Sequence, residues 1–166
     1  MYNPNDFNID SFSVALGDSE SGTGTGTGAE YDYSVVNDIG AIGKYQFMPT
    51  TITDIAQRHN LTRPSNYEFQ NSPDIQEQYF KLYVSDILNW INDYNLDSYI
   101  GQIKTGQGNN ITYPIDIYGL VAASWLGGIG HLINYLQSGK DYNDGRTYIS
   151  DYLTKFSSFQ LGKKKI

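Results

Sequence analysis

Glu20 is the acidic side chain whose setting best fits acid–base chemistry. It stands in "ALGDSESGTGTGTG", where a predicted helix gives way to a loop rich in glycine and threonine. A carboxyl group that is half-buried against apolar neighbours has its charged form disfavoured, so its pKa rises and it can donate a proton near neutral pH. Position alone leaves open the ordinary alternative of a solvated glutamate near a helix end.

The glycine run after Glu20 does not have the spacing of a nucleotide-binding loop. Such loops use G-x-G-x-x-G between a strand and a helix, or end in Gly-Lys-Ser/Thr. Here the glycines alternate strictly with threonine, follow a predicted helix and precede no Gly-Lys-Ser/Thr. We therefore expect a flexible surface loop over residues 22–30 and no phosphate site.

Other catalytic chemistries find little support in the residue types. The chain has no cysteine, which excludes a thiol nucleophile, a disulfide framework and a zinc finger. The two histidines, His59 and His131, lie far apart in sequence and outside any His-Glu-x-x-His pattern, so we expect no metal and no cofactor. Ser21 and Ser124 have no evident His–Asp partners, which argues against a nucleophilic triad.

Charge and hydropathy exclude several classes of partner. The net charge of −7 disfavours nucleic acid. No stretch approaches the roughly 20 apolar residues of a membrane span. The first ten residues are polar and acidic, unlike a secretory signal peptide, and the basic tail at 162–166 is expected to be solvated. Fifteen tyrosines supply flat faces with a polar tip, suited either to half-buried packing or to stacking on sugars.

The elements that must position these residues are mainly helical, in a single domain over residues 1–166 with its core at about 7–158. Apolar spacing predicts a first helix from Phe7 that ends at Gly17 or Gly22. Ser72 is the expected N-cap of a long helix that reaches Ile91. Residues 101–112 are expected to be a polar connection, and a short β-hairpin between 29 and 47 stays open. The remaining helices are expected at 49–60, at 113–126 as a buried central helix, and in the short segments 131–137 and 146–156.

Three segments occur in an order that resembles the lysozyme-like superfamily of lytic transglycosylases, goose-type lysozymes and phage muramidases. They are "ESG" at 20–22, "NDIGAIGKYQFMPTT" at 37–51 and "GLVAASWLGGIGHL" at 119–132. That superfamily has a Glu-Ser at a helix end, a "GAxGxxQxMPxT" segment and a later "AAYNAG"-like helix end. The resemblance is nearest to phage-associated and related bacterial wall-degrading domains. It implies a two-lobed helical fold with a buried central helix and a saccharide cleft.

Matched residue by residue, the resemblance makes Glu20 the catalytic acid and Ser21 the serine that helps to position it. Gly40 and Gly43 match glycines that turn the backbone beneath the sugar, where a side chain would obstruct close approach. Gln46 matches a glutamine that hydrogen-bonds the saccharide.

Tyr45, Met48 and Trp125 complete the expected substrate-binding set. Met48 matches a cleft-lining methionine, although simple core filling is an equal alternative for both Tyr45 and Met48. Trp125 replaces a tyrosine whose hydroxyl usually contacts the catalytic carboxyl. Because an indole donates a hydrogen bond but accepts none, Trp125 either remakes that contact or serves as a platform for a sugar.

The resemblance implies cleavage of the β-1,4 bond between N-acetylmuramic acid and N-acetylglucosamine in peptidoglycan, without a metal or cofactor. A lytic transglycosylase, which forms 1,6-anhydro ends, needs one carboxyl group and is the favoured expectation. A hydrolytic muramidase needs a second carboxylate, for which the candidates are Glu30, Asp32 and Asp38. A catalytically silent wall-binding domain is a further alternative. The implied partners are glycan strands and other phage virion or lysis proteins, with delivery by a virion, a lysis system or a longer exported protein.

Overall fold

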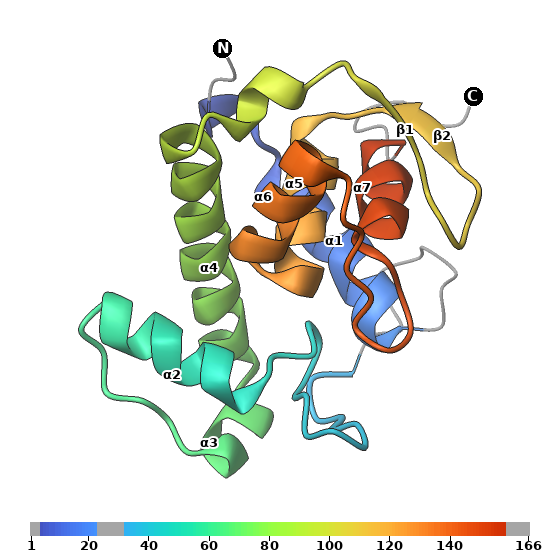
Figure 1. Cartoon of the computed structure of the whole chain (residues 1–166). Helices are drawn as coiled ribbons and strands as arrows, with labels where there is room; N and C mark the ends of the chain where they lie inside the picture. The colour runs from blue at the N-terminus through green and yellow to red at the C-terminus, as the bar shows by residue number, and fades with distance from the viewer. Residues whose placement is uncertain (1–3, 23–31, 159–166) are drawn as a thin grey trace. The chain divides into compact units, whose positions relative to one another are not determined.

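The computed structural model describes residues 4–22 and 32–158, and this part of the chain is mainly helical, as predicted. It contains seven α-helices, two short 3₁₀ helices and one two-stranded antiparallel sheet (Figure 1). The chain divides into two compact units, Ile9–Ser85 and a second unit that combines Met1–Asn8 with Asp86–Ile166. The boundary falls inside one long helix, α4 (Pro73–Asp93). Among the described helices, none combines the length and apolar character that a bilayer crossing requires.

The unit Ile9–Ser85 contains α1, α2, α3 and the first half of α4. The first helix, α1 (Ile9–Ser21), runs through Gly17 and ends directly before Gly22. Between residues 32 and 48 the chain forms turns with isolated antiparallel bridges, Val36 to Ile42 and Ile42 to Phe47, in place of the hairpin considered for this region. Two short helices follow, α2 (Pro49–Arg58) and α3 (Asn66–Gln70).

The start of α4 follows the predicted capping pattern. The Ser72 hydroxyl accepts a hydrogen bond from the Ile75 amide at 3.3 Å, and Pro73 occupies the first helical position. The short helix α3 is capped in the same way, by Ser65, whose hydroxyl accepts from the Glu68 amide. The sequence did not predict α3, because a five-residue helix is too short to show an apolar period.

The core of this unit is built on stacked aromatic rings. The ring of Tyr45 lies 4.2 Å from that of Phe80, nearly parallel to it, and Phe80 also stacks against Phe12 on α1. Phe47 and Phe69 meet edge to face at 5.2 Å. These rings tie α1, the 32–48 segment and α4 into one apolar cluster.

The second unit is organised around the buried helix α5 (Ile117–Gly127). The sequence predicts this helix, but its expected start at residue 113 is wrong, because Thr112–Pro114 form a strand. Helix α5 packs against α6 (Ile129–Ser138) and α7 (Ile149–Ser157) (Figure 1). Gly119 permits a close approach of α5 to α7, because a Cβ there would lie 2.3 Å from the Leu153 carbonyl oxygen. At the N-terminus of α5, a carboxylate oxygen of Asp116 accepts from the Gly119 amide at 3.0 Å.

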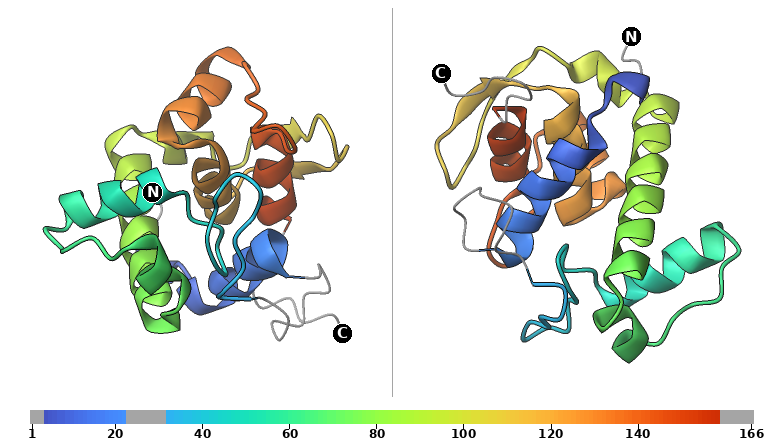
Figure 2. Two further views of the ribbon diagram at one scale, coloured as in Figure 1. Left: turned by 90° about the horizontal axis from the view of Figure 1, so that it is seen from below. Right: turned by 180° about the vertical axis from the view of Figure 1, so that it is seen from behind.

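The expectation that residues 101–112 form only a polar connection is wrong. After the 3₁₀ helix η2 (Leu96–Tyr99), a hairpin pairs β1 (Ile103–Thr105) with β2 (Thr112–Pro114) and lies beside α7 (Figure 2). Strands of three residues with mostly exposed side chains are too short to show an apolar alternation. The tip of the hairpin is held by Asp151, whose carboxylate accepts from the amides of Gly108 and Asn109.

Candidate functional site

Glu20 lies in the last turn of α1, so its predicted place at the end of the first helix is confirmed. Its side chain is half-buried. The last turn contains a second acid, Asp18, and no basic residue. A half-buried carboxyl group at a helix end is the setting that was expected for the general acid.

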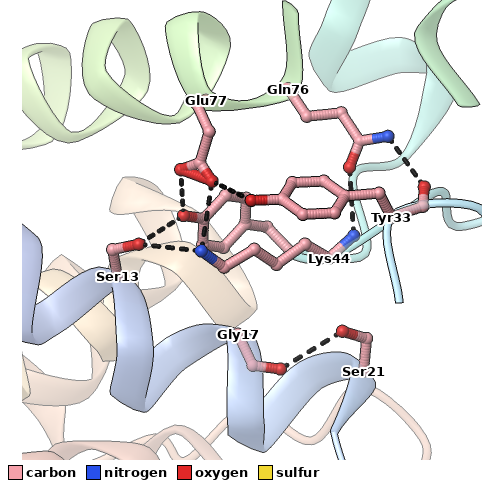
Figure 3. A network of polar contacts seen from close by, with 8 residues as sticks. Ser13, Gly17, Ser21, Tyr33, Lys44, Gln76 and Glu77 are labelled. Carbon is pink, nitrogen blue, oxygen red and sulfur yellow. Dashed lines mark hydrogen bonds and ion pairs between the residues drawn. The ribbon is translucent and has the colours of Figure 1, made fainter. Parts of the chain in front are cut away.

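Ser21 is tied to its own helix. Its hydroxyl donates to the Gly17 carbonyl oxygen at 3.2 Å, as Figure 3 shows. A serine has only one hydroxyl proton, so in this conformation Ser21 can act toward another group only as an acceptor. The role of Ser21 in positioning Glu20 stays a prediction.

Gly40 and Gly43 both have positive φ, +88° and +81°, as backbone-turning glycines should. The reason for Gly43 differs from the one expected. A Cβ at Gly43 would lie 2.1 Å from Oε1 of Gln76, while a Cβ at Gly40 would meet nothing within 4 Å. Gly43 is buried, so the close approach that it permits is to a protein side chain rather than to a sugar.

Gln46 has an unusual backbone for a residue with a side chain, with φ of 54° in the left-handed region. It is half-buried, and its Nε2 donates to the Gly43 carbonyl at 2.9 Å. Such a conformation costs about 1 kcal/mol and is over-represented at functional sites. Met48, at the start of α2, is 37% exposed, so the core-filling alternative is wrong for this residue.

Tyr45 is a core residue, which corrects the expectation that it binds substrate directly. Its side chain is 0% exposed, and its ring stacks on Phe80. Its hydroxyl donates to Oε1 of Glu77. Burial raises the pKa of this hydroxyl, and the hydrogen bond to Glu77 raises it further, so Tyr45 stays a neutral donor.

A polar cluster that sequence reasoning missed surrounds the Tyr45 hydroxyl (Figure 3). Lys44 Nζ lies 3.1 Å from Oε2 of Glu77 and 3.0 Å from the hydroxyl oxygen of Ser13. Tyr33 donates its hydroxyl to the same Oε2 at 2.8 Å. Because Tyr45 gives its single proton to Glu77, the 2.6 Å contact between Ser13 and Tyr45 has Ser13 as the donor.

This cluster joins segments that are far apart in the sequence. Ser13 comes from α1, Glu77 from α4, and Tyr33, Lys44 and Tyr45 from the 32–48 segment between them. In the sequence, Glu77 only appears as a favourable acid in the first turn of a helix, and no spacing rule pairs it with Lys44. Only the lysine of "GKYQF", followed by a tyrosine in an otherwise apolar setting, could have signalled a buried charge.

A buried amide holds the same segment to α4. Gln76 is 0% exposed. Its Oε1 accepts from the Lys44 amide at 3.1 Å, and its Nε2 donates to the carbonyls of Tyr33 and Phe69, each at 2.8 Å. The amide group of Gln76 thereby sets the backbone that leads from Lys44 to Gln46.

The three candidates for a second carboxylate differ in what the structure says of them. Glu30 lies outside the described residues. Asp32 is exposed and accepts from the Ser34 hydroxyl at 2.7 Å and from the Ser34 amide at 2.8 Å. These hydrogen bonds hold the pKa of Asp32 below its usual value, so this carboxylate is ionised at neutral pH. Asp38 is exposed in the tight turn that follows Asn37.

Trp125 belongs to the other unit, half-buried in the last turn of α5. Its neighbour Ser124 is 0% exposed, and the Ser124 hydroxyl has no hydrogen-bond partner among the described residues. His131 is exposed on α6 and stacks on the ring of Tyr142 at 3.8 Å. Both alternatives for Trp125, a contact with the catalytic carboxyl group and a platform for a sugar, stay predictions.

Chemically, the described residues place the half-buried carboxyl group of Glu20 at the end of α1, ahead in sequence of a turn segment with three positive φ angles. In the same described part of the chain, no three His, Cys, Asp or Glu side chains gather as metal ligands would. Comparison of the chain with protein-family models, with curated proteins and with solved structures finds no match.

Proposed function

We propose that this protein degrades peptidoglycan, with Glu20 as the acid that cleaves the β-1,4 bond between N-acetylmuramic acid and N-acetylglucosamine. The observation that carries the proposal is the place of Glu20, half-buried in the last turn of α1. The order of its "ESG", "GAIGKYQFMP" and "AASWLGGIG" segments, and their resemblance to lysozyme-like enzymes, give the substrate class. In this proposal the domain is lysozyme-like and acts on the bacterial wall, delivered by a virion, a lysis system or a longer exported protein.

The proposed reaction is that of a lytic transglycosylase. Glu20 donates its proton to the glycosidic oxygen as the bond to C1 of the muramic acid breaks. The N-acetyl group of that sugar stabilises the developing cation. The ionised Glu20 then removes the proton of the C6 hydroxyl as its oxygen bonds to C1, which gives a 1,6-anhydro end and restores the acid. One carboxyl group is enough for both steps.

Hydrolysis is the second candidate reaction. The observation in its favour is the lowered pKa of the Asp32 carboxyl group. A carboxylate that is ionised at neutral pH can hold and activate a water molecule. Asp32 is in the same unit as Glu20, and in a hydrolytic enzyme it would serve as the base. Glu30 and Asp38 are further candidates for this role.

Glu20→Gln tests the proposal, because it removes the proton donor and keeps the shape of the side chain. Asp18→Asn is the matched control, since it makes the same change of charge in the same helical turn. We expect Glu20→Gln to lose at least about a hundredfold in the rate at which purified peptidoglycan clears, and Asp18→Asn to stay near the wild-type rate. Equal clearing by Glu20→Gln and wild type would contradict the assignment.

Two further readouts separate the alternatives. Mass spectrometry of the released muropeptides distinguishes anhydro ends from reducing ends, which are heavier by one water. Reducing ends alone would replace the transglycosylase with the muramidase. If neither wild type nor Glu20→Gln clears the walls but both sediment with them, the domain is a catalytically silent wall binder.

A further inference from the structure

A shallow hollow lies in the unit Ile9–Ser85, away from the core. It has a volume of about 350 Å³ and is open to solvent. This volume lies at the lower end of the range of small-molecule sites. Its described lining comes from two short stretches of chain, one on each side: Asp32, Tyr33, Ser34, Gln70, Asn71 and Pro73.

The two walls of the hollow are joined by a hydrogen bond. Gln70 Nε2, at the end of α3, donates to the Ser34 carbonyl at 2.7 Å. Behind this contact, Gln76 Nε2 donates to the Tyr33 carbonyl. The backbone on both sides is therefore fixed before any ligand arrives, which reduces the entropy lost on binding.

The polar side chains of the hollow use part of their donors internally. The Ser34 hydroxyl donates to Oδ1 of Asp32, the Asn71 amide nitrogen donates to the Tyr67 carbonyl at 2.8 Å, and Gln70 Nε2 donates to Ser34. Each amide nitrogen keeps one further N–H. The side-chain acceptors among the lining residues are the Asp32 carboxylate and the amide oxygens of Gln70 and Asn71, and Asp32 is the one charged group of the described lining.

We infer that this hollow is a binding site for a primary ammonium group carried on a short aliphatic chain. An ammonium group has three donors and no acceptor, which matches a carboxylate flanked by two amide oxygens. The Pro73 ring offers an apolar wall for the methylene groups that carry the charge. A sugar hydroxyl fits less well, because it carries no charge to pair with the Asp32 carboxylate.

No lysine or arginine belongs to the described lining of the hollow, and the nearby Lys44 ammonium is already paired with Glu77. The fixed carboxylate adds a charge-assisted hydrogen bond, which is stronger than a neutral one. Peptidoglycan stem peptides carry a diamino acid whose side-chain amine is free wherever it is not cross-linked. If the proposed function holds, that amine is the ligand, and the hollow would favour walls with uncross-linked stems.

The first test uses a soluble probe and does not depend on catalysis. Nα-acetyl-lysine amide has a free ε-ammonium group, and its Nε-acetylated form lacks the charge. We expect the free amine alone to shift the backbone amide resonances of Ser34, Gln70 and Asn71 in ¹H–¹⁵N spectra of the whole chain. Asp32→Asn should weaken this binding about tenfold, the effect of one charge-assisted hydrogen bond. Asp54→Asn, an exposed acid on α2, is the matched control and should bind like wild type.

The second test identifies the source of the amine. Purified walls are compared with walls whose free amines have been acetylated, in sedimentation with the Glu20→Gln variant. Weaker sedimentation with acetylated walls, seen for Glu20→Gln and lost on adding Asp32→Asn, supports the stem peptide as ligand. Probe binding with no difference between the walls assigns the site to a free amine instead. Absence of the amide shifts, or equal shifts with the acetylated probe, would overturn the inference while leaving the role of Glu20 untouched.

Discussion

Lys44 and Glu77 form an ion pair whose partners differ in exposure: the Lys44 side chain is 4% exposed and that of Glu77 is 29%. Removal of Glu77, the more exposed partner, leaves the buried Lys44 ammonium without a counter-charge. Removal of Lys44 leaves the Glu77 carboxylate, which water can reach. Glu77→Gln should therefore destabilise by about 3 kcal/mol, and Lys44→Met by about half as much. Urea unfolding of the two variants measures the difference, and a larger loss for Lys44→Met would contradict this account.

Gly43 and Gly40 form a matched pair of positions with similar φ and different surroundings. Alanine at either position should lower the free energy of unfolding by about 1 kcal/mol, because its backbone must adopt a left-handed conformation. At Gly43 the new Cβ must also displace Gln76 and its three hydrogen bonds, so Gly43→Ala should lose about 3 kcal/mol or more. At Gly40 nothing lies within 4 Å of the Cβ position. If Gly43→Ala and Gly40→Ala had equal midpoints in thermal unfolding, the Gln76 side chain would move aside without cost.

Asp116 caps α5 while its carboxyl group is largely buried. Burial raises its pKa to about 6, against hydrogen bonds from Gly119, Tyr118 and Ser157 that lower it. A folded-state pKa above the ordinary 3.8 means that folding takes up a proton at intermediate pH, so the contribution of Asp116 to stability is full below pH 4 and is lost as pH rises through 6.

Asp116→Asn keeps a capping oxygen without the charge. The variant should gain on wild type by about 1–3 kcal/mol in unfolding free energy as pH rises from 4 to 7. Denaturant unfolding at a series of pH values measures this gain. A constant difference across the series would show that the carboxyl group of Asp116 titrates alike in the folded and unfolded chains.

Substitution of Gln46 is expected to lower activity with little change in stability. Gln46→Gly relieves a left-handed backbone at the expense of one hydrogen bond to the Gly43 carbonyl, so its stability should stay within about 1 kcal/mol of wild type. If the side chain binds saccharide as proposed, the clearing rate of peptidoglycan should fall at least about tenfold. Unchanged clearing by a folded Gln46→Gly variant would remove Gln46 from the proposed site.

The parts of the fold that the sequence predicted are those governed by local rules. The helix that begins at Ser72 and Pro73 shows its cap and its apolar face within one stretch of chain, and the structure contains it as α4. The hairpin of β1 and β2 was missed because three-residue strands have almost no pattern. The fully buried Tyr45 was placed among the ligand contacts because its motif suggested a cleft, and nothing local reveals that Phe80 covers its ring.

The candidate site was likewise predictable only where a short stretch of sequence carries the signal. Glu20 was predicted from the resemblance of three segments to lysozyme-like enzymes, because its place before a glycine-rich loop alone also fits a solvated glutamate. The ion pair of Lys44 and Glu77, and the amide of Gln76 behind Gly43, depend on residues that are more than 30 positions apart. Such contacts depend on how the 32–48 segment crosses α4, which apolar period and residue type do not encode.

The hydrogen bonds of the Gln76 side chain also predict the order in which α4 and the 32–48 segment fold. Its side chain holds the backbone at Tyr33 and Lys44, which lie 43 and 32 positions away, so these contacts close long loops. Helix α4 can form from local contacts, and the 32–48 segment is then expected to dock after the main barrier has been crossed. Gln76→Ala should accordingly speed unfolding and leave the refolding rate almost unchanged, as a chevron plot would record. The 32–48 segment would then be the last described part of its unit to become native and the first to open.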